Sequence, residues 1–143
     1  MMENNETERL LVEIGRILAQ DTEYPLDGTL LYARLDHAYV APAIFKHLGN
    51  QILYRWPDLD VLGDALLELW EAQDSEPRWA EMEYLINGGK FSATYTYPDE
   101  IDPDDDDTFD RRDRIVRKYF GDKPIVYPDS FPPDDVDQPT YEL

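Results

Sequence analysis

Apolar residues recur at the helical period in three segments of the chain. The first segment carries Leu10, Leu11, Ile14, Ile17 and Leu18, with Asn5 or Thr7 as a possible N-cap. The second follows Pro57 and carries Leu62, Ala65, Leu66, Leu69 and Trp70. The third ends before Gly121 and carries Phe109, Ile115, Val116, Tyr119 and Phe120. The pattern predicts three amphipathic helices, the last closed by a glycine C-cap.

Between the first two helices, the pattern changes to the alternation that is typical of strands. One strand is predicted around residues 31–35, with one buried face, a second around residues 40–47 and a third around residues 52–56. Pro42 lies in the second strand and has no N–H to donate to a ladder, so this segment is expected at a sheet edge or a bulge.

A β-hairpin is predicted around Asn87-Gly88, because this dipeptide favours a two-residue type I′ turn. The turn would place apolar pairs on one face, namely Ile86 with Gly89, Tyr84 with Phe91, Met82 with Ala93 and Ala80 with Tyr95. Trp79, Glu81 and Glu83 would then share the opposite, solvent-facing side. An aromatic side chain rimmed by carboxylates is typical of an interface anchor, so these three are candidate partner-binding residues.

These elements predict one α+β domain over residues 1–123, an antiparallel β-sheet with packed helices in the order α-βββ-α-ββ-α. A chain of 143 residues is long enough to bury one core. Residues 124–143 contain five prolines, so we expect an acidic tail without regular elements that packs irregularly or is partly disordered.

The chain is strongly acidic, with 32 Asp and Glu residues against 13 Lys and Arg residues and a net charge of -19. Capping of the third helix explains a few of the carboxylates between residues 99 and 110, but their density calls for a basic partner, a cation or solubility. We expect a basic protein to dock there. The candidate residues are Asp99, Glu100, Asp102, Asp104, Asp105, Asp106, Asp107 and Asp110.

A calcium-responsive or adaptor-type protein-binding module is the alternative. Asp102, Asp104, Asp106, Thr108, Asp110 and Asp113 fall at the ligand spacings of an EF-hand loop. However, Asp107 replaces the glycine at the sixth position, and Asp113 is shorter than the bidentate glutamate at the twelfth. We therefore expect neither a metal nor a cofactor.

Other chemistry has little support in the sequence. A basic cluster at residues 111–118 has acidic residues four positions earlier, which predicts local neutralisation, with no direct nucleic-acid binding. His37 and His47 lack metal-ligand spacing, and no nucleophile motif is present, so no catalytic residue is expected and the chain is predicted not to be an enzyme. A small hydrolase using carboxylates would require a deep pocket in which acids converge. The acidic first residues and the lack of cysteine favour the cytoplasm, with no membrane contact.

Several segments share a likeness to one known family. They are Gly89-Lys90-Phe91, Tyr95-Thr96-Tyr97, the acidic stretch from Asp99, Arg114-Ile115 and Lys118-Tyr119-Phe120-Gly121, together with Leu66 to Trp70 and Tyr32. With the order of the elements, they resemble the YezG-like family of bacterial immunity proteins from about Glu8 to Lys123.

This resemblance implies an antidote made in the cytosol. Such proteins bind and block the toxic C-terminal domain of a polymorphic or contact-dependent growth inhibition toxin, commonly a nuclease. Nucleases are typically basic where they hold phosphate, so an acidic protein could dock there and occlude the substrate. The expected partner is therefore a cognate toxin domain, a basic nuclease.

Overall fold

A computed structural model describes residues 2–37, 39–73, 77–102, 104 and 108–127. The elements are α1 (Met2–Leu18), β1 (Thr29–Asp36), β2 (Tyr39–His47), β3 (Ile52–Arg55), α2 (Leu59–Glu71), β4 (Glu81–Asn87), β5 (Lys90–Thr96), the 3₁₀ turn η1 (Pro98–Glu100), α3 (Thr108–Phe120) and β6 (Ile125–Val126). The predicted α+β class and the order α-βββ-α-ββ-α are confirmed. Helix α1 begins before the two N-cap positions that the sequence suggested. Across these residues, no helix has both the length and the apolar character needed to cross a bilayer.

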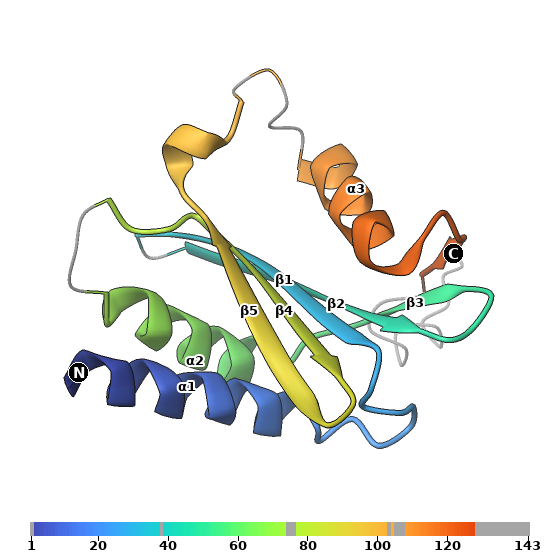
Figure 1. Cartoon of the computed structure of the whole chain (residues 1–143), viewed down its shortest axis with the longest axis horizontal. Helices are drawn as coiled ribbons and strands as arrows, with labels where there is room; N and C mark the ends of the chain where they lie inside the picture. Colours follow the sequence, from blue (N-terminus) through green and yellow to red (C-terminus); the bar gives the residue numbers. More distant parts are fainter. Residues whose placement is uncertain (1, 38, 74–76, 103, 105–107, 128–143) are drawn as a thin grey trace, which may run out of the picture.

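The strands form one sheet in the order β5-β4-β1-β2-β3-β6 (Figure 1). All neighbouring strands are antiparallel except β3 and β6, which are parallel, so the sheet is mixed rather than purely antiparallel. The backbone N–H of Ile52 donates to the carbonyl of Pro124 at 2.9 Å and extends this pairing. The expected absence of regular structure after residue 123 is therefore wrong for Ile125 and Val126. The remainder of the predicted tail, residues 128–143, lies outside the described residues.

Helices α1 and α2 cover one face of the sheet (Figure 1). Leu10, Ile14 and Leu18 of α1 are buried, as are Leu62, Ala65, Leu66, Leu69 and Trp70 of α2. They pack against the side chains that β1, β2 and β4 direct to this face, which include Leu31, Ile44 and Tyr84. Both predicted apolar stripes are therefore confirmed as the source of the main core.

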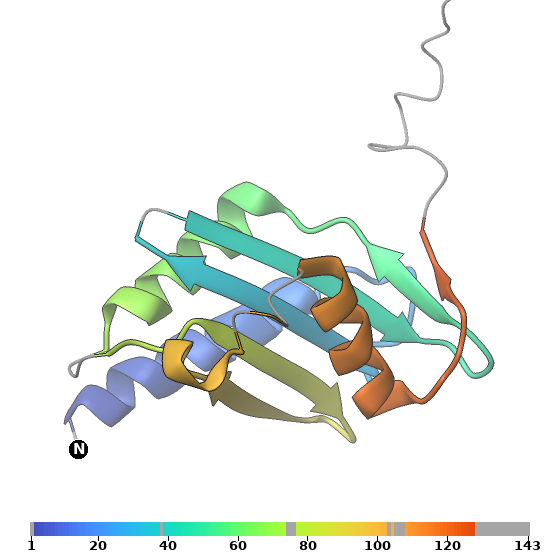
Figure 2. The ribbon, with the colours of Figure 1, turned by 90° about the horizontal axis from the view of Figure 1, so that it is seen from above.

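Helix α3 covers the opposite face, as the view from above shows (Figure 2). Val116 and Phe120 are buried against Leu30, Phe45 and further side chains of the sheet. Gly121, at a φ of 87°, ends the helix and donates its N–H to the carbonyl of Arg117, so the predicted C-cap is confirmed. Because helices lie on both faces, β1 is buried along both of its sides and not along one as expected.

The β4–β5 hairpin turns at Gly88-Gly89, one residue later than predicted. Both glycines have positive φ, 61° and 75°, as both central positions of a type I′ turn require. Asn87 then pairs with Lys90 and Ile86 with Phe91, so the predicted register is wrong by two residues on β5. A shift by two residues keeps side-chain parity, and the apolar face of the hairpin is as expected.

Gly15 of α1 lies against the phenol of Tyr84 in β4. Tyr84 Oη donates to the carbonyl of Leu11 at 2.6 Å, and a Cβ on Gly15 would lie 2.8 Å from the same Oη. Alanine normally stabilises a helix interior by roughly 0.5–1 kcal/mol relative to glycine. Here we expect Gly15→Ala to destabilise by about 1–3 kcal/mol, because the buried ring has no room to retreat.

A double-mutant cycle with Tyr84→Phe, followed by urea unfolding, tests this contact. Without the hydroxyl, Gly15→Ala should become neutral or stabilising. An equal effect of the glycine substitution in both backgrounds would contradict the contact.

Candidate interaction surface

Glu81 is buried, contrary to the predicted solvent-facing position of Glu81 and Glu83. Its side chain is 0% exposed and accepts hydrogen bonds from Tyr32 Oη at 2.6 Å and from Arg111 Nε and Nη2 at 2.7 and 2.9 Å. Arg34 Nε lies 3.6 Å away. Arg111 of α3 thus forms a bidentate ion pair with a carboxylate of the sheet. The alternation along β4 did not indicate that α3 covers this face.

Glu83 is also covered by α3. It accepts hydrogen bonds from Lys118 Nζ at 2.9 Å and from Tyr119 Oη at 2.6 Å. Arg111 and Lys118 are two helical turns apart, while Glu81 and Glu83 are neighbours on the same face of β4. The two acids therefore fix both ends of α3 to the sheet, and neither is available to a partner.

Trp79 lies on the other side of the sheet from these acids and is buried in the core under α1 and α2. Its carbonyl accepts a hydrogen bond from Trp70 Nε1 at 2.6 Å, and its N–H donates to Gln73. Because β4 begins only at Glu81, the strand alternation does not extend back to Trp79. The predicted interface anchor is thus a core residue.

The acidic loop is the segment of residues 99–110 that carries the candidate carboxylates. Those of its candidates that the structure describes are exposed. The exposed candidates are Asp99, Glu100, Asp102, Asp104 and Asp110. Glu100 accepts a hydrogen bond from the N–H of Tyr97 at 2.8 Å, and Asp102 accepts one from the N–H of Asp104 at 2.9 Å. Some of the carboxylates therefore stabilise local turns. The other three candidates, Asp105, Asp106 and Asp107, lie outside the described residues.

The calcium alternative stays a prediction, because Asp106 and Asp107 lie outside the described residues. Within those residues, no group of three or more His, Cys, Asp or Glu side chains could hold a metal ion. The acids four positions earlier predict three neutralising pairs, and one of them, Asp113 with Arg117, is confirmed at 3.9 Å. Arg111 binds Glu81 in the sheet, and its predicted partner Asp107 lies outside the described residues.

Sequence reasoning missed an acidic row on the outer face of α2. The row runs opposite the buried stripe and consists of Asp60, Asp64, Glu68 and Glu71, all exposed. Arg9 of α1 lies 3.9 Å from Glu68, the third residue of the row. The spacing of four, four and three residues was visible in the sequence and could have identified it.

An apolar groove lies beside the start of α2. Its volume is about 430 Å³, and its walls are Val40, Ala41, Pro42, Tyr54, Trp56, Pro57 and Leu59. Leu59 is 61% exposed, Trp56 38% and the neighbouring Tyr39 52%. Leu59 lies outside the buried stripe of α2, so the sequence also indicated an exposed leucine at the start of this helix. Large apolar side chains gathered at the surface are typical of interaction sites.

The groove exists because β3 is shorter than β2. Among the described residues, β3 pairs with residues 44–47 of β2, whereas β1 pairs with residues 39–46. Pro42 therefore lies beyond the end of β3, opposite Ala33 of β1. Strand β2 lies inside the sheet between β1 and β3, so the predicted place of this segment at a sheet edge is wrong, although among the described residues the part with Pro42 is unpaired on its β3 side. The chain after β3 crosses this unpaired side to reach α2.

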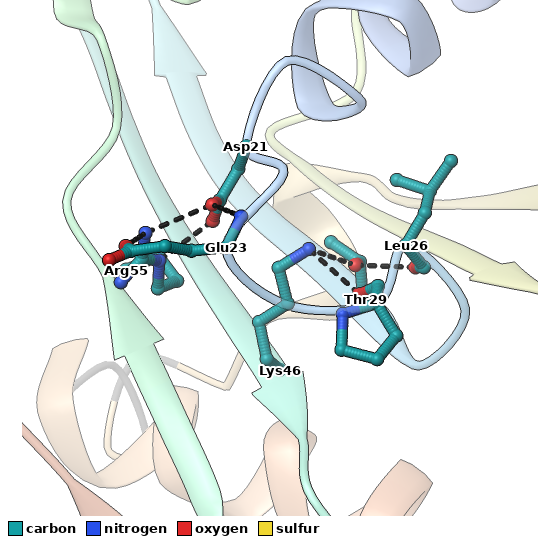
Figure 3. A network of polar contacts seen from close by, with 7 residues as sticks. Asp21, Glu23, Leu26, Thr29, Lys46 and Arg55 are labelled. Carbon is teal, nitrogen blue, oxygen red and sulfur yellow. Dashed lines mark hydrogen bonds and ion pairs between the residues drawn. The ribbon is translucent and has the colours of Figure 1, made fainter.

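The α1–β1 connection is fixed to the sheet by a polar network (Figure 3). Arg55 of β3 bonds Asp21 at 2.7 and 2.9 Å and Glu23 at 2.6 Å, and Lys46 of β2 donates to Thr29 Oγ1 at 2.9 Å. Burial alone would raise the pKa of Asp21, but the hydrogen bonds from Arg55 and from a backbone N–H outweigh it and lower that pKa. Burial lowers the pKa of Lys46. These contacts hold the segment between α1 and β1 against β2 and β3.

A larger cavity, of about 660 Å³, lies between the start of the acidic loop and the start of β2. It is bounded by Pro98 and Ile101 on the loop side and by Tyr39 at the start of β2, with Trp70 and Trp79 among its walls. Tyr39 directly precedes Val40, a wall of the groove. The cavity and the groove are therefore lined by consecutive residues of β2.

The chain matches no model of a protein family, and no curated protein matches it in sequence. The resemblance given above stays a prediction.

We expect Glu81→Gln to destabilise the protein by about 3 kcal/mol, because Arg34 and Arg111 would face a neutral amide where they now share a buried carboxylate. The control is Glu8→Gln on the exposed side of α1, which should change stability by less than about 0.5 kcal/mol. Urea unfolding followed by circular dichroism measures both. Similar losses in the two variants would contradict the proposed anchoring of α3.

The free energy of unfolding should decrease above about pH 10, because two tyrosines keep their protons in the folded state. Burial raises the pKa of Tyr84 to about 12, and burial with the hydrogen bond to Glu83 raises the pKa of Tyr119 to about 12. The folded state keeps these protons while the unfolded chain loses them near pH 10, so the stability they contribute is complete below pH 10 and is lost as the pH rises toward 12.

The free energy of unfolding, measured at several values between pH 9 and pH 12, tests this dependence. Tyr119→Phe should lose less stability over this range than the unchanged chain. A profile that is flat to pH 12 would show that the two phenols are not held in their protonated form.

Proposed function

We propose that the chain is a cytoplasmic bacterial immunity protein. It binds the C-terminal domain of a cognate toxin, a basic nuclease, and neutralises it by stoichiometric binding rather than by catalysis.

The observation that carries the proposal is where the exposed acids lie. Two of the acids predicted to be accessible are buried as anchors of α3, but the described acids of the loop and those of the α2 row face solvent. Like charges four residues apart destabilise a helix by roughly 0.2–0.5 kcal/mol per pair, so a row of them has a cost in stability. Attraction of a positively charged partner would explain why the chain carries these repelling acids.

The position of the acids also favours rapid binding. Carboxylates around an exposed apolar surface attract a basic protein over several ångströms and raise the rate of encounter. The apolar contacts then slow its release. The segments that resemble the YezG-like family support the same role, since that family is composed of immunity proteins.

The direct test is a titration against the toxin C-terminal domain encoded immediately upstream of this protein's gene. A tight one-to-one complex that abolishes toxicity is expected. Failure to bind or to protect would overturn the proposed function and favour an adaptor-type module.

Neutralising the loop with Asp99→Asn, Asp102→Asn and Asp104→Asn together should slow association with the toxin domain about tenfold at low salt. The dissociation rate should change less, and the difference should shrink as salt screens the charges. Stopped-flow measurements at several salt concentrations give both rates.

The matched control neutralises Glu6, Glu8 and Glu13 on α1, which lies on the other face of the sheet from α3 (Figure 1). This triple variant changes the net charge by the same amount, so a similar slowing in both would show that only total charge matters. An unchanged rate in the loop variant would contradict steering by the loop.

A further inference from the structure

We propose that the apolar groove beside the start of α2 is the site where the basic partner inserts a large apolar side chain. The inference rests on the proposed function and assigns its contact surface. The anchors on this chain are Trp56 and Leu59, and the acids beside them are Asp58 and Asp60.

The shape and composition of the groove suit a single anchor. Its volume of about 430 Å³ lies in the lower part of the range of ligand sites, roughly 300–1,000 Å³. Trp56 packs edge-on against Tyr54 with ring centroids 4.9 Å apart, so the tryptophan is held while one side of it stays exposed. A fixed, half-exposed aromatic ring loses little conformational entropy on binding, as interface hot spots require.

The charge beside the groove specifies a basic partner. Asp58 and Asp60 are exposed and flank Leu59 in the sequence. Asp58 is the N-cap of α2 and accepts hydrogen bonds from the N–H groups of Asp60 and Val61, which fixes its carboxylate in position. A Lys or Arg next to the apolar anchor of the partner could pair with these acids.

The nearby cations already have partners within this chain. Arg55, which precedes Trp56, is bound by Asp21 and Glu23. Arg112 donates to Tyr127 Oη at 3.0 Å and lies over the ring of Tyr54. The side of the groove at the start of α2 therefore presents negative charge.

Two other occupants fit the structure less well. A second copy of this chain would bring a surface of net charge -19 against the same acidic rim, which like-charge repulsion opposes. An added β-strand would need donors along the exposed edge of β2, but Pro42 has no N–H there. Docking through side chains therefore suits both the apolar groove and the acids beside it.

The test measures binding of the upstream-encoded toxin domain to Trp56→Ala, Leu59→Ala and Leu59→Lys. We expect Trp56→Ala to weaken affinity about 30-fold and Leu59→Ala about tenfold, mainly through faster dissociation. Leu59→Lys should weaken it further, because it sets a cation against a basic partner. Since Leu59 is 61% exposed, its variants keep the inference testable if Trp56→Ala fails to fold.

The matched control is Val61→Ala. Val61 is in the same turn of α2 and is 46% exposed but does not line the groove. Its affinity should stay within about threefold of the unchanged chain. Equal effects at Val61 and Leu59, or no effect at Leu59 and Trp56, would overturn the inference while the proposed function stands.

Two further outcomes are decisive. If the unchanged chain does not bind the toxin domain at all, the proposed function fails and the inference falls with it. If sedimentation shows a dimer of this chain that Leu59→Lys dissociates, the groove is occupied by a second copy and the inference is wrong.

Discussion

The buried contact between Glu81 and Arg111 determines how the rest of the molecule is arranged. A carboxylate without solvent is costly unless it is paired and fully hydrogen-bonded, and here Arg111, Tyr32 and Arg34 surround it. Arg111 belongs to α3, so the buried Glu81 carboxylate has this partner only when α3 packs on the sheet. The contact therefore fixes where α3 lies, and with it which parts of the sheet remain uncovered.

That arrangement leaves one edge of the molecule open. Helices α1 and α2 cover one face of the sheet and α3 covers the other, but β3 ends before it reaches the first half of β2 (Figures 1 and 2). Trp56 and Leu59 lie at this gap, and exposed carboxylates flank Leu59. The acids of this chain thus have two physical roles, since the buried ones hold α3 and the exposed ones make its surface attractive to cations.

Local patterns in the sequence were enough to predict the three helices and the first five strands, but not β6 or the long-range contacts. The stripes of α1 and α2 and the cap at Gly121 follow from neighbouring residues, so they were predicted correctly. The burial of Glu81 and Glu83 depends on a helix 30 residues later in the chain, which alternation along a strand does not report. The register error arose because the signal of Asn87-Gly88 competes with Gly88-Gly89, where both residues accept positive φ freely.

The central claim is that a basic partner docks on the acid-flanked groove of a scaffold held together by buried ion pairs. Amide hydrogen exchange of the chain, measured with and without the toxin domain, tests it most directly, because bound backbone is protected wherever the partner lies. The account predicts new protection in residues 39–43 and 56–61, with α1 unchanged. Protection confined to α1, or to β5 on the far edge of the sheet, would contradict it.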